Sequence, residues 1–301
     1  MALQVAASAA RSGKANLAQE LRALIEQWRK GSSRARKPIP VGQPRGDREG
    51  LLSVSYPDVS PSDLVLLRSV REQLQRVLVE QRQYDELRSH GFAPTRKLLL
   101  VGPSGTGKTL SARMLASQLH LPLFTIRLDG LITKYMGETA AKLRIIFDAM
   151  ADVRGVYLFD EVDALAGERG RSNDVGEIRR VLNSFLQFLE EDDSESVLVA
   201  ATNHPSLLDK ALFRRFDVVV SYQMPTRDVV KAVIQRRLAG MKVGVLDWTQ
   251  IAHAAKALSH SDITLAAEYA AKAVILQGRK SVQTRDLVAA LQGRRADLRI
   301  S

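Results

Sequence analysis

Apolar residues in the middle of the chain fall in short, nearly unbroken runs that are separated by stretches with helical spacing. The runs are 97–101 (KLLLV), 121–126 (LPLFTI), 156–160 (VYLFD), 196–202 (SVLVAAT) and 217–222 (DVVVSY). Short runs rich in β-branched residues and leucine are typical of strands that are buried on both faces. The pattern predicts an α/β domain over residues 61–224, in which helices sandwich a parallel sheet.

The regions on either side of these runs have the spacing of helices. Apolar residues from Leu64 onward recur at three- and four-residue intervals, which predicts a helix capped by Ser62 and ended by Gly91. After Pro225 the strand-like runs cease, and residues 225–301 are predicted to form a small all-α domain. Its helices are predicted near 226–239, 249–258, 261–277 and 284–292.

The amino-terminal segment 1–60 is predicted to lie outside the α/β domain. Apolar residues between Leu17 and Trp28 recur at helical spacing and predict one short helix. Residues 31–50 are dense in Gly, Pro, Ser and Arg without periodicity, which is typical of a flexible basic linker. The helix either packs on the chain's own domain or docks on a partner.

The charge distribution argues against nucleic acid as the partner. The formal net charge is +11, but residues 1–50 hold ten basic and four acidic residues and so carry +6 of it. The excess therefore belongs to the amino-terminal segment more than to the domain, and such a segment either contacts acidic partners or is simply solvated.

Composition also limits the chemistry and the compartment. The 301 residues include no cysteine, and the five histidines show no metal-ligand spacing, so neither disulfides nor a thiolate metal site is expected. No apolar run approaches the roughly 18 residues that span a bilayer. We therefore expect no membrane contact and a cytoplasmic location.

A glycine-rich octapeptide, GPSGTGKT, follows the first predicted strand directly and precedes a predicted helix. In this setting the motif forms a phosphate-binding loop, because its backbone amides and the helix N-terminus face phosphate oxygens. We expect Lys108 to reach the β- and γ-phosphates of a nucleotide and Thr109 to ligate Mg²⁺. The predicted nucleotide-binding residues are Gly102, Pro103, Ser104, Gly105, Thr106, Gly107, Lys108, Thr109 and Leu110.

Polar residues at the ends of the later predicted strands complete a candidate ATP-hydrolysing site. Asp160 and Glu161 end one strand beside the predicted loop, where Asp160 would hold Mg²⁺ through water and Glu161 would polarise the attacking water. Asn203 ends the next strand, within reach of that water or the γ-phosphate. The alternatives are a capped strand end for the acids and an ordinary turn for Asn203.

The segment LDKALFRRFD carries two adjacent arginines, Arg214 and Arg215, with Asp217 as the only obvious acidic partner near them in sequence. An arginine that neutralises charge in phosphoryl transfer can contribute on the order of 10³ in rate. The pair is therefore a further candidate for catalysis.

Together these motifs resemble those of the AAA ATPases of the AAA+ superfamily. The resemblance covers roughly residues 60–292. It rests on GPSGTGKT, LFDEVDA, the region from LNSFLQFLE through VAATNHPSLLDKALFRRFD, and a KYMGE loop. It implies one stand-alone module in which an α/β core precedes a helical lid, and rings, usually hexamers, with nucleotide at subunit interfaces. In such rings Arg214 and Arg215 would reach the neighbour's γ-phosphate, and Asn203 would be the sensor.

Two segments depart from the pattern of many relatives. The arginines are adjacent, where many relatives separate them by two residues, so which of the two is the principal finger stays open. The lid helix begins LSHSDI where relatives often read Gly-Phe-Ser-Gly-Ala-Asp. The resemblance then puts His260 and Ser261 where the lid meets the adenosine.

The KYMGE loop contains Lys134, Tyr135 and Met136 and lies between a predicted strand and the next helix. A ring could direct this loop towards its channel, where relatives grip polypeptide with the matching aromatic residue. The resemblance thus assigns the grip to Tyr135. In the alternative, Tyr135 packs under the next helix with Phe147.

The function favoured by the sequence is an ATP-driven protein remodeller or unfoldase that threads polypeptide through a ring. A separate protease partner fits a chain in which no protease domain is recognisable. The alternatives are a nucleic-acid loader, which the basic charge favours, and an ATP-driven switch, which the complete catalytic set disfavours.

Overall fold

The computed structural model describes residues 50–131, 138–166 and 175–298. The chain divides into two compact units, Met1–Gly42 and Gln43–Ser301, and every described element belongs to the second. The predicted helix that ends near Trp28 and the predicted pore loop Lys134–Met136 lie outside the described residues. Their structures therefore stay predictions.

A six-stranded sheet with the order β1-β3-β4-β5-β2-β6 forms the centre of the second unit. Its strands are β1 (Leu52–Ser55), β2 (Lys97–Val101), β3 (Leu123–Ile126), β4 (Val156–Phe159), β5 (Val197–Thr202) and β6 (Val218–Ser221). All neighbouring strands are parallel except β1 and β3, which are antiparallel. The predicted α/β fold is thus confirmed, and β2, β4 and β5 are buried along their whole length because helices cover both faces.

Strand β1 corrects the prediction that the whole segment 1–60 lies outside the α/β domain. Leu52 pairs with Ile126 and Ser55 with Leu123, so this segment is an edge strand of the sheet. Its apolar run is too short to stand out from the linker before it, and its pairing partner β3 comes only after β2 in the chain. The boundary of the predicted linker therefore falls before β1.

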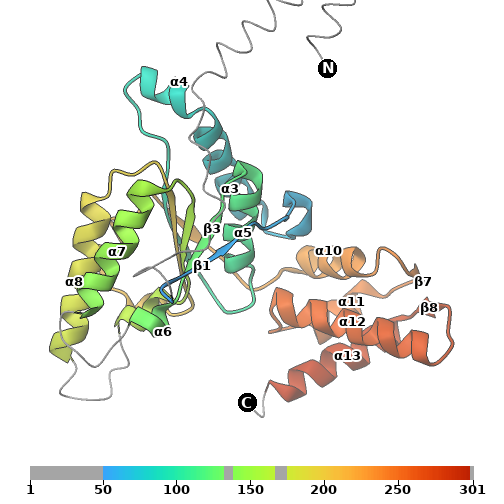
Figure 1. The fold of residues 1–301 in the computed structure, drawn as a ribbon. Helices are drawn as coiled ribbons and strands as arrows, with labels where there is room; N and C mark the ends of the chain where they lie inside the picture. The colour runs from blue at the N-terminus through green and yellow to red at the C-terminus, as the bar shows by residue number, and fades with distance from the viewer. Residues whose placement is uncertain (1–49, 132–137, 167–174, 299–301) are drawn as a thin grey trace, which may run out of the picture. The chain divides into compact units, whose positions relative to one another are not determined.

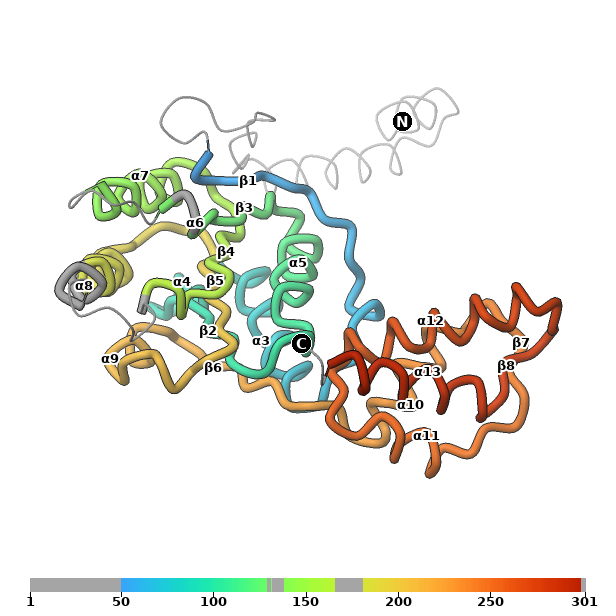
Figure 2. The backbone as a smooth tube through the Cα atoms, turned by 90° about the horizontal axis from the view of Figure 1, so that it is seen from below, coloured from blue at the N-terminus to red at the C-terminus, as the bar shows by residue number. Residues whose placement is uncertain are grey.

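Helices pack against both faces of the sheet (Figures 1 and 2). One face carries α3 (Arg68–Arg82) and α5 (Lys108–Leu119), and the other carries α7 (Glu138–Asp152) and α8 (Val175–Glu191). The shorter elements are η2 (Pro61–Asp63), α4 (Tyr84–Ser89), α6 (Leu128–Leu131), η3 (Val162–Ala166), η4 (Pro205–Leu207) and α9 (Lys210–Phe213). The single helix predicted from Ser62 to Gly91 is wrong in its start, because the cap is Ser60 and it caps the 3-10 helix η2.

Aromatic rings fill the core between the sheet and the helices α7 and α8. Phe147 contacts Phe159, Phe185 and Phe188, with ring centroids between 5.5 and 6.1 Å apart. Phe159 lies on β4 and Phe185 on α8, and both are fully buried. Tilted and edge-on pairs of this kind add to the free energy gained by burial, so they fix α7 and α8 against the strand that precedes the candidate acids.

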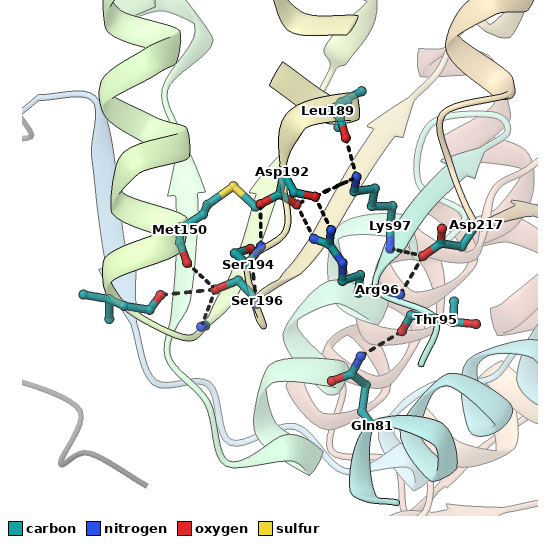
Figure 3. A network of polar contacts seen from close by, with 12 residues as sticks. Gln81, Thr95, Arg96, Lys97, Met150, Leu189, Asp192, Ser194, Ser196 and Asp217 are labelled. Atoms are coloured by element: carbon teal, nitrogen blue, oxygen red, sulfur yellow. Dashed lines mark hydrogen bonds and ion pairs between the residues drawn. The ribbon is translucent and has the colours of Figure 1, made fainter. Parts of the chain in front are cut away.

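A network of charged residues lies at the amino ends of β2 and β6 (Figure 3). The carboxylate of Asp192, just after α8, accepts a hydrogen bond from Arg96, and Lys97 donates to the carbonyl oxygen of Leu189. Asp217 accepts from the backbone amides of Arg96 and Lys97 at 2.8 and 2.9 Å. Burial lowers the pKa of Lys97. The network ties the end of α8 to the starts of two strands.

The carboxyl-terminal region, called the lid below, consists of four helices and a small sheet. The helices are α10 (Arg227–Arg237), α11 (Trp248–Ala254), α12 (His260–Leu276) and α13 (Thr284–Asp297). The prediction of an all-α region is corrected in one respect, because β7 (Lys242–Val243) pairs in parallel with β8 (Ser281–Val282). These strands have two residues each, which is too short for a strand-like run to show.

Side-chain bonds fix the lid helices at their ends. Ser259 and Asp262 form a capping box at the start of α12, and Arg294 of α13 donates to Asp262 at 2.9 Å. Arg279 donates twice to the Asp286 carboxylate near the start of α13, at 2.7 and 3.0 Å.

Among the described residues, no helix is both long enough and apolar enough to cross a membrane.

Candidate active site

Three adjacent strands deliver the predicted catalytic residues to one edge of the sheet. The order β4-β5-β2 sets side by side the segments that begin with Asp160, Asn203 and Gly102. Ligands in open α/β sheets bind outside the carboxyl ends of the strands. The structure therefore brings together the phosphate-binding loop, the acid pair and the candidate sensor.

The loop packs so closely on its surroundings that two positions require glycine. A Cβ added at Gly102 would lie 2.3 Å from the carbonyl oxygen of Tyr222, and the φ of Gly102 is +147°. A Cβ at Gly105 would lie 2.4 Å from the Ser259 hydroxyl oxygen of the lid, and the φ of Gly105 is +70°. Both the space and the backbone angles exclude other side chains.

Lys108 is the first residue of α5 and is buried under the loop. Its ammonium donates to the carbonyl oxygens of Gly102 and Pro103, each at 2.8 Å, and to the Asn203 side-chain oxygen at 2.7 Å. Burial lowers the pKa of Lys108. The three bonds use all three donors of the ammonium. Lys108 and Asn203 thus meet at one point, as a shared γ-phosphate site requires.

Thr109 and Asp160 form the second contact between the loop and the acid pair. The Thr109 hydroxyl donates to the Asp160 carboxylate at 2.7 Å. A hydroxyl and a carboxylate oxygen are both ligands that Mg²⁺ accepts, and Mg²⁺ normally completes its shell with water and substrate phosphates. Within the described ranges no group of three or more His, Cys, Asp or Glu could hold a metal alone. The pair fits a Mg²⁺ ion that arrives with a nucleotide.

Glu161 has an unusual backbone conformation. Its φ is +55°, which is uncommon for a residue with a side chain, and its amide donates to the Asp160 carboxylate at 3.1 Å. Its side chain is exposed and lines the cleft described below. Strained backbone of this kind clusters at functional sites and costs of order 1 to 3 kcal/mol.

The segment that carries Asn203 is anchored through its neighbours. The Thr202 hydroxyl donates to the Asp163 carboxylate at 2.6 Å and accepts the amide of His204 at 2.9 Å. Asp163 lies in η3, immediately after the acid pair. These bonds fix Asn203 relative to Glu161, although no pattern in the sequence indicated them.

The start of α12 closes the site from the lid. The Ser261 amide donates to the carbonyl oxygen of Gly105 at 3.1 Å. His260 lines the cleft, but both of its ring nitrogens are buried and lack a hydrogen-bond partner in the described part of the chain. Burial lowers the pKa of His260. Near neutral pH the ring is therefore neutral, with one donor and one acceptor.

The site opens into a cleft of about 990 Å³ between the loop, the acid pair and the lid. Ser104 to Leu110 form its floor. Sequence reasoning missed the segment Asp63–Leu66, which forms another wall, and Arg236 of the lid, which pairs with Asp63. The Ser-x-x-Asp capping box that begins at Ser60 is the signal that could have shown that this segment is not part of a long helix.

Arg214 and Arg215 are not among the described residues that line the cleft. They follow α9, and both are exposed. Arg215 pairs with Glu190 of α8 at 2.8 Å, a partner that the sequence did not reveal. Within one subunit the pair is therefore separate from the candidate site.

The cleft fits a nucleoside triphosphate with Mg²⁺. Its volume is that of an ordinary ligand site, and its floor is a phosphate-binding loop that leads into a helix N-terminus. Thr109 and Asp160 at one side of this floor supply metal-binding oxygens.

The sequence is similar to those of known proteins. The family model described as "ATPase family associated with various cellular activities (AAA)" matches residues 98–224. An uncharacterized AAA family ATPase of Sinorhizobium fredii, y4kL, is 38% identical over 236 residues, which are 78% of this chain and 71% of that protein. The chain belongs to the AAA family. This AAA ATPase is accordingly an ATP hydrolase.

Two further similarities extend the comparison. The proteasome-activating nucleotidase of Methanococcus vannielii is 30% identical over 233 residues, which are 75% of this AAA chain and 56% of that protein. The crystal structure of the FIGL-1 AAA domain aligns with a TM-score of 0.64 at 24% identity, over 81% of this chain and 86% of that chain. The second likeness shows a shared fold, and the first covers little more than half of the relative.

Proposed function

We propose that this AAA ATPase binds Mg-ATP in the cleft, hydrolyses it with the residues of the strand edge, and uses the energy to remodel protein substrates. One observation carries the proposal: Lys108, Asn203 and the Thr109–Asp160 pair all line one cleft and are joined by hydrogen bonds. Bound Mg²⁺ would neutralise charge on the transferred phosphate. The chain would supply the positioning and the proton acceptor.

Each residue has a distinct task in this proposal. The Lys108 ammonium exchanges at least one of its protein acceptors for a phosphate oxygen, because all three donors are already engaged. Thr109 and Asp160 would hold the metal that accompanies the nucleotide. Glu161 orients the attacking water and accepts its proton. Asn203 contacts the γ-phosphate.

The lid and the segment before α3 hold the nucleoside. Ser261 bonds to the loop, and the neutral ring of His260 offers its hydrogen-bonding groups to the adenosine. Leu64 and Leu66 provide buried apolar surface at the other wall. An apolar cleft with few convergent polar groups suits a base and a ribose.

We further propose that the subunits assemble as a homo-hexameric ring. Arg214 and Arg215 are not among the described residues that line the cleft of their own subunit, and both are exposed, which suits a role at a neighbour's γ-phosphate. In the ring Tyr135, flanked by Lys134 and Met136, would grip an extended polypeptide in the channel. The similarity to a proteasome-activating nucleotidase supports a protein substrate and a separate protease partner. The location that we propose for this assembly is the cytoplasm.

Glu161→Gln tests the assignment of the proton acceptor. The substitution keeps the volume but removes the base, so ATP should still bind while steady-state hydrolysis falls by at least about 100-fold. Lys108→Ala should instead lose ATP binding. Unchanged turnover of Glu161→Gln protein would remove Glu161 from the mechanism, and unchanged ATP affinity of Lys108→Ala protein would refute the site.

A further inference from the structure

Tyr222 lies directly after β6, next to β2 in the sheet, and its side chain is buried, with 4% of the residue exposed. Its hydroxyl donates to the Ser111 hydroxyl oxygen at 2.7 Å, and Ser111 in turn donates to the carbonyl oxygen of Gly107 at 2.9 Å. Gly107 is the last residue of the phosphate-binding loop before α5. A relay of two hydroxyl groups therefore connects Tyr222 to the end of the loop.

The backbone of Tyr222 also contacts the beginning of the loop. Its amide donates to the carbonyl oxygen of Val101 at 2.7 Å. Its own carbonyl oxygen lies against Gly102 so closely that a Cβ there would be 2.3 Å away. One residue thus acts on both ends of the loop, on Gly102 through its backbone and on Gly107 through the Ser111 hydroxyl.

The relay acts on a peptide group that faces the phosphate site. The carbonyl of Gly107 and the amide of Lys108 belong to one planar peptide unit, so fixing the carbonyl direction also fixes the direction of the N–H. The Lys108 N–H is among the first amides of α5, which have no partner within the helix and are available to an anion. Two bonds from Ser111, through its amide and its hydroxyl, hold that carbonyl.

We propose that Tyr222 is a positioning residue for nucleotide binding, which orients the phosphate-binding loop through Ser111. The inference rests on the proposed nucleotide site, and it adds a residue outside the loop, the acid pair and the cleft lining. Burial raises the pKa of Tyr222 above its ordinary value, so the hydroxyl remains protonated and can donate near neutral pH. The relay therefore does not vary with pH near neutrality.

Tyr222→Phe removes only the hydroxyl and leaves the ring and the backbone contacts. Loss of the buried hydrogen bond to Ser111 should raise the Kd for ATP, measured with Mg²⁺ by equilibrium titration, about five- to tenfold. The kcat at saturating ATP should stay within about twofold, because Glu161, the proposed water-activating residue, follows another strand, β4. The expected split is thus a raised KM with a nearly constant kcat.

Tyr157→Phe is the matched control. Tyr157 is also a buried tyrosine, and its hydroxyl donates to the carbonyl oxygens of Ala149 and Val153 at 2.9 and 3.0 Å. Ala149 lies in α7 and Val153 directly follows that helix, so neither acceptor belongs to the phosphate-binding loop. Both variants should lower the melting temperature, but only Tyr222→Phe should weaken ATP binding. Equal ATP affinity in the two variants would reduce Tyr222 to a purely structural role and overturn the proposal.

Ser111→Ala provides the second arm. It interrupts the same relay, so it should weaken ATP binding by a similar factor, and Tyr222→Phe/Ser111→Ala should bind no more weakly than the worse single variant. Additive losses would refute the relay. If wild-type protein bound no ATP, the proposed nucleotide site would be refuted. If wild-type protein bound ATP and neither variant weakened that binding, only the role of Tyr222 would be refuted.

Discussion

Asp192→Ala should destabilise the domain far more than a surface charge does. The Asp192 side chain is 3% exposed and accepts from Arg96, with Lys97 3.9 Å away. The substitution leaves two largely buried cations without their carboxylate. It also removes the acceptor for the amide of Ser194. Breaking a buried ion pair by removing one partner costs about 3 to 5 kcal/mol.

Backbone carbonyl groups that also accept hydrogen bonds from these two cations reduce the expected cost to near the lower end of that range. Arg96 and Lys97 also donate to the carbonyl oxygen of Asp192, and Lys97 donates to that of Leu189, and these acceptors survive the substitution. We therefore expect a loss of about 3 kcal/mol in the free energy of unfolding. At roughly 2 to 4 °C per kcal/mol for a domain of this size, the melting temperature should fall by about 6 to 12 °C.

Glu72→Ala is the matched control for an exposed pair. The side chains of Arg68 and Glu72 are 92% and 59% exposed, and pairs of this kind contribute about 0 to 1 kcal/mol. Urea unfolding followed by circular dichroism measures both variants. Adding Lys97→Met to Asp192→Ala should restore part of the loss, because it removes one uncompensated cation. A loss for Asp192→Ala as small as that for Glu72→Ala would show that the network contributes nothing to folding.

Three further predictions concern the lid, the ring and the pore loop. The hydrogen bond from Arg279 lowers the pKa of Asp286, so its contribution to stability is present above the ordinary carboxyl pKa of about 3.9 and is lost as the pH falls through the lower folded-state value. Asp286→Asn should abolish this acid dependence of the melting temperature. Arg214→Ala/Arg215→Ala protein mixed with Glu161→Gln protein should recover ATPase activity if the arginines act in trans, and strictly additive rates would contradict that. Tyr135→Ala should keep basal ATPase activity but lose substrate unfolding, and normal unfolding would exclude the grip.

The local motifs could be predicted because their chemistry is contiguous in sequence. GPSGTGKT follows a buried strand, and Asp160 and Asn203 follow two others, so parallel strands that lie side by side bring them to one edge. The α/β fold could be predicted from the alternation of apolar runs and helical stretches alone, and it is confirmed. The roles of these residues stay proposals.

Contacts between distant segments could not be predicted. Glu190 pairs with Arg215, and the Tyr222 hydroxyl reaches Ser111, across separations that no periodicity reveals. The wall at Leu64 to Leu66 was assigned to a helix, because its apolar spacing fits a helix equally well. The capping box between Ser60 and Asp63 is the one local signal that separates this segment from the helix that follows it.

The antiparallel strand β1 determines where the chain can be shortened. It covers the outer edge of β3 over four residue pairs, and an uncovered edge presents free backbone groups that template aggregation. A truncation that begins at position 60 would expose that edge, whereas one that begins near position 45 would retain β1. Soluble expression and colloidal stability should therefore change abruptly between two deletions that differ by little more than this one strand.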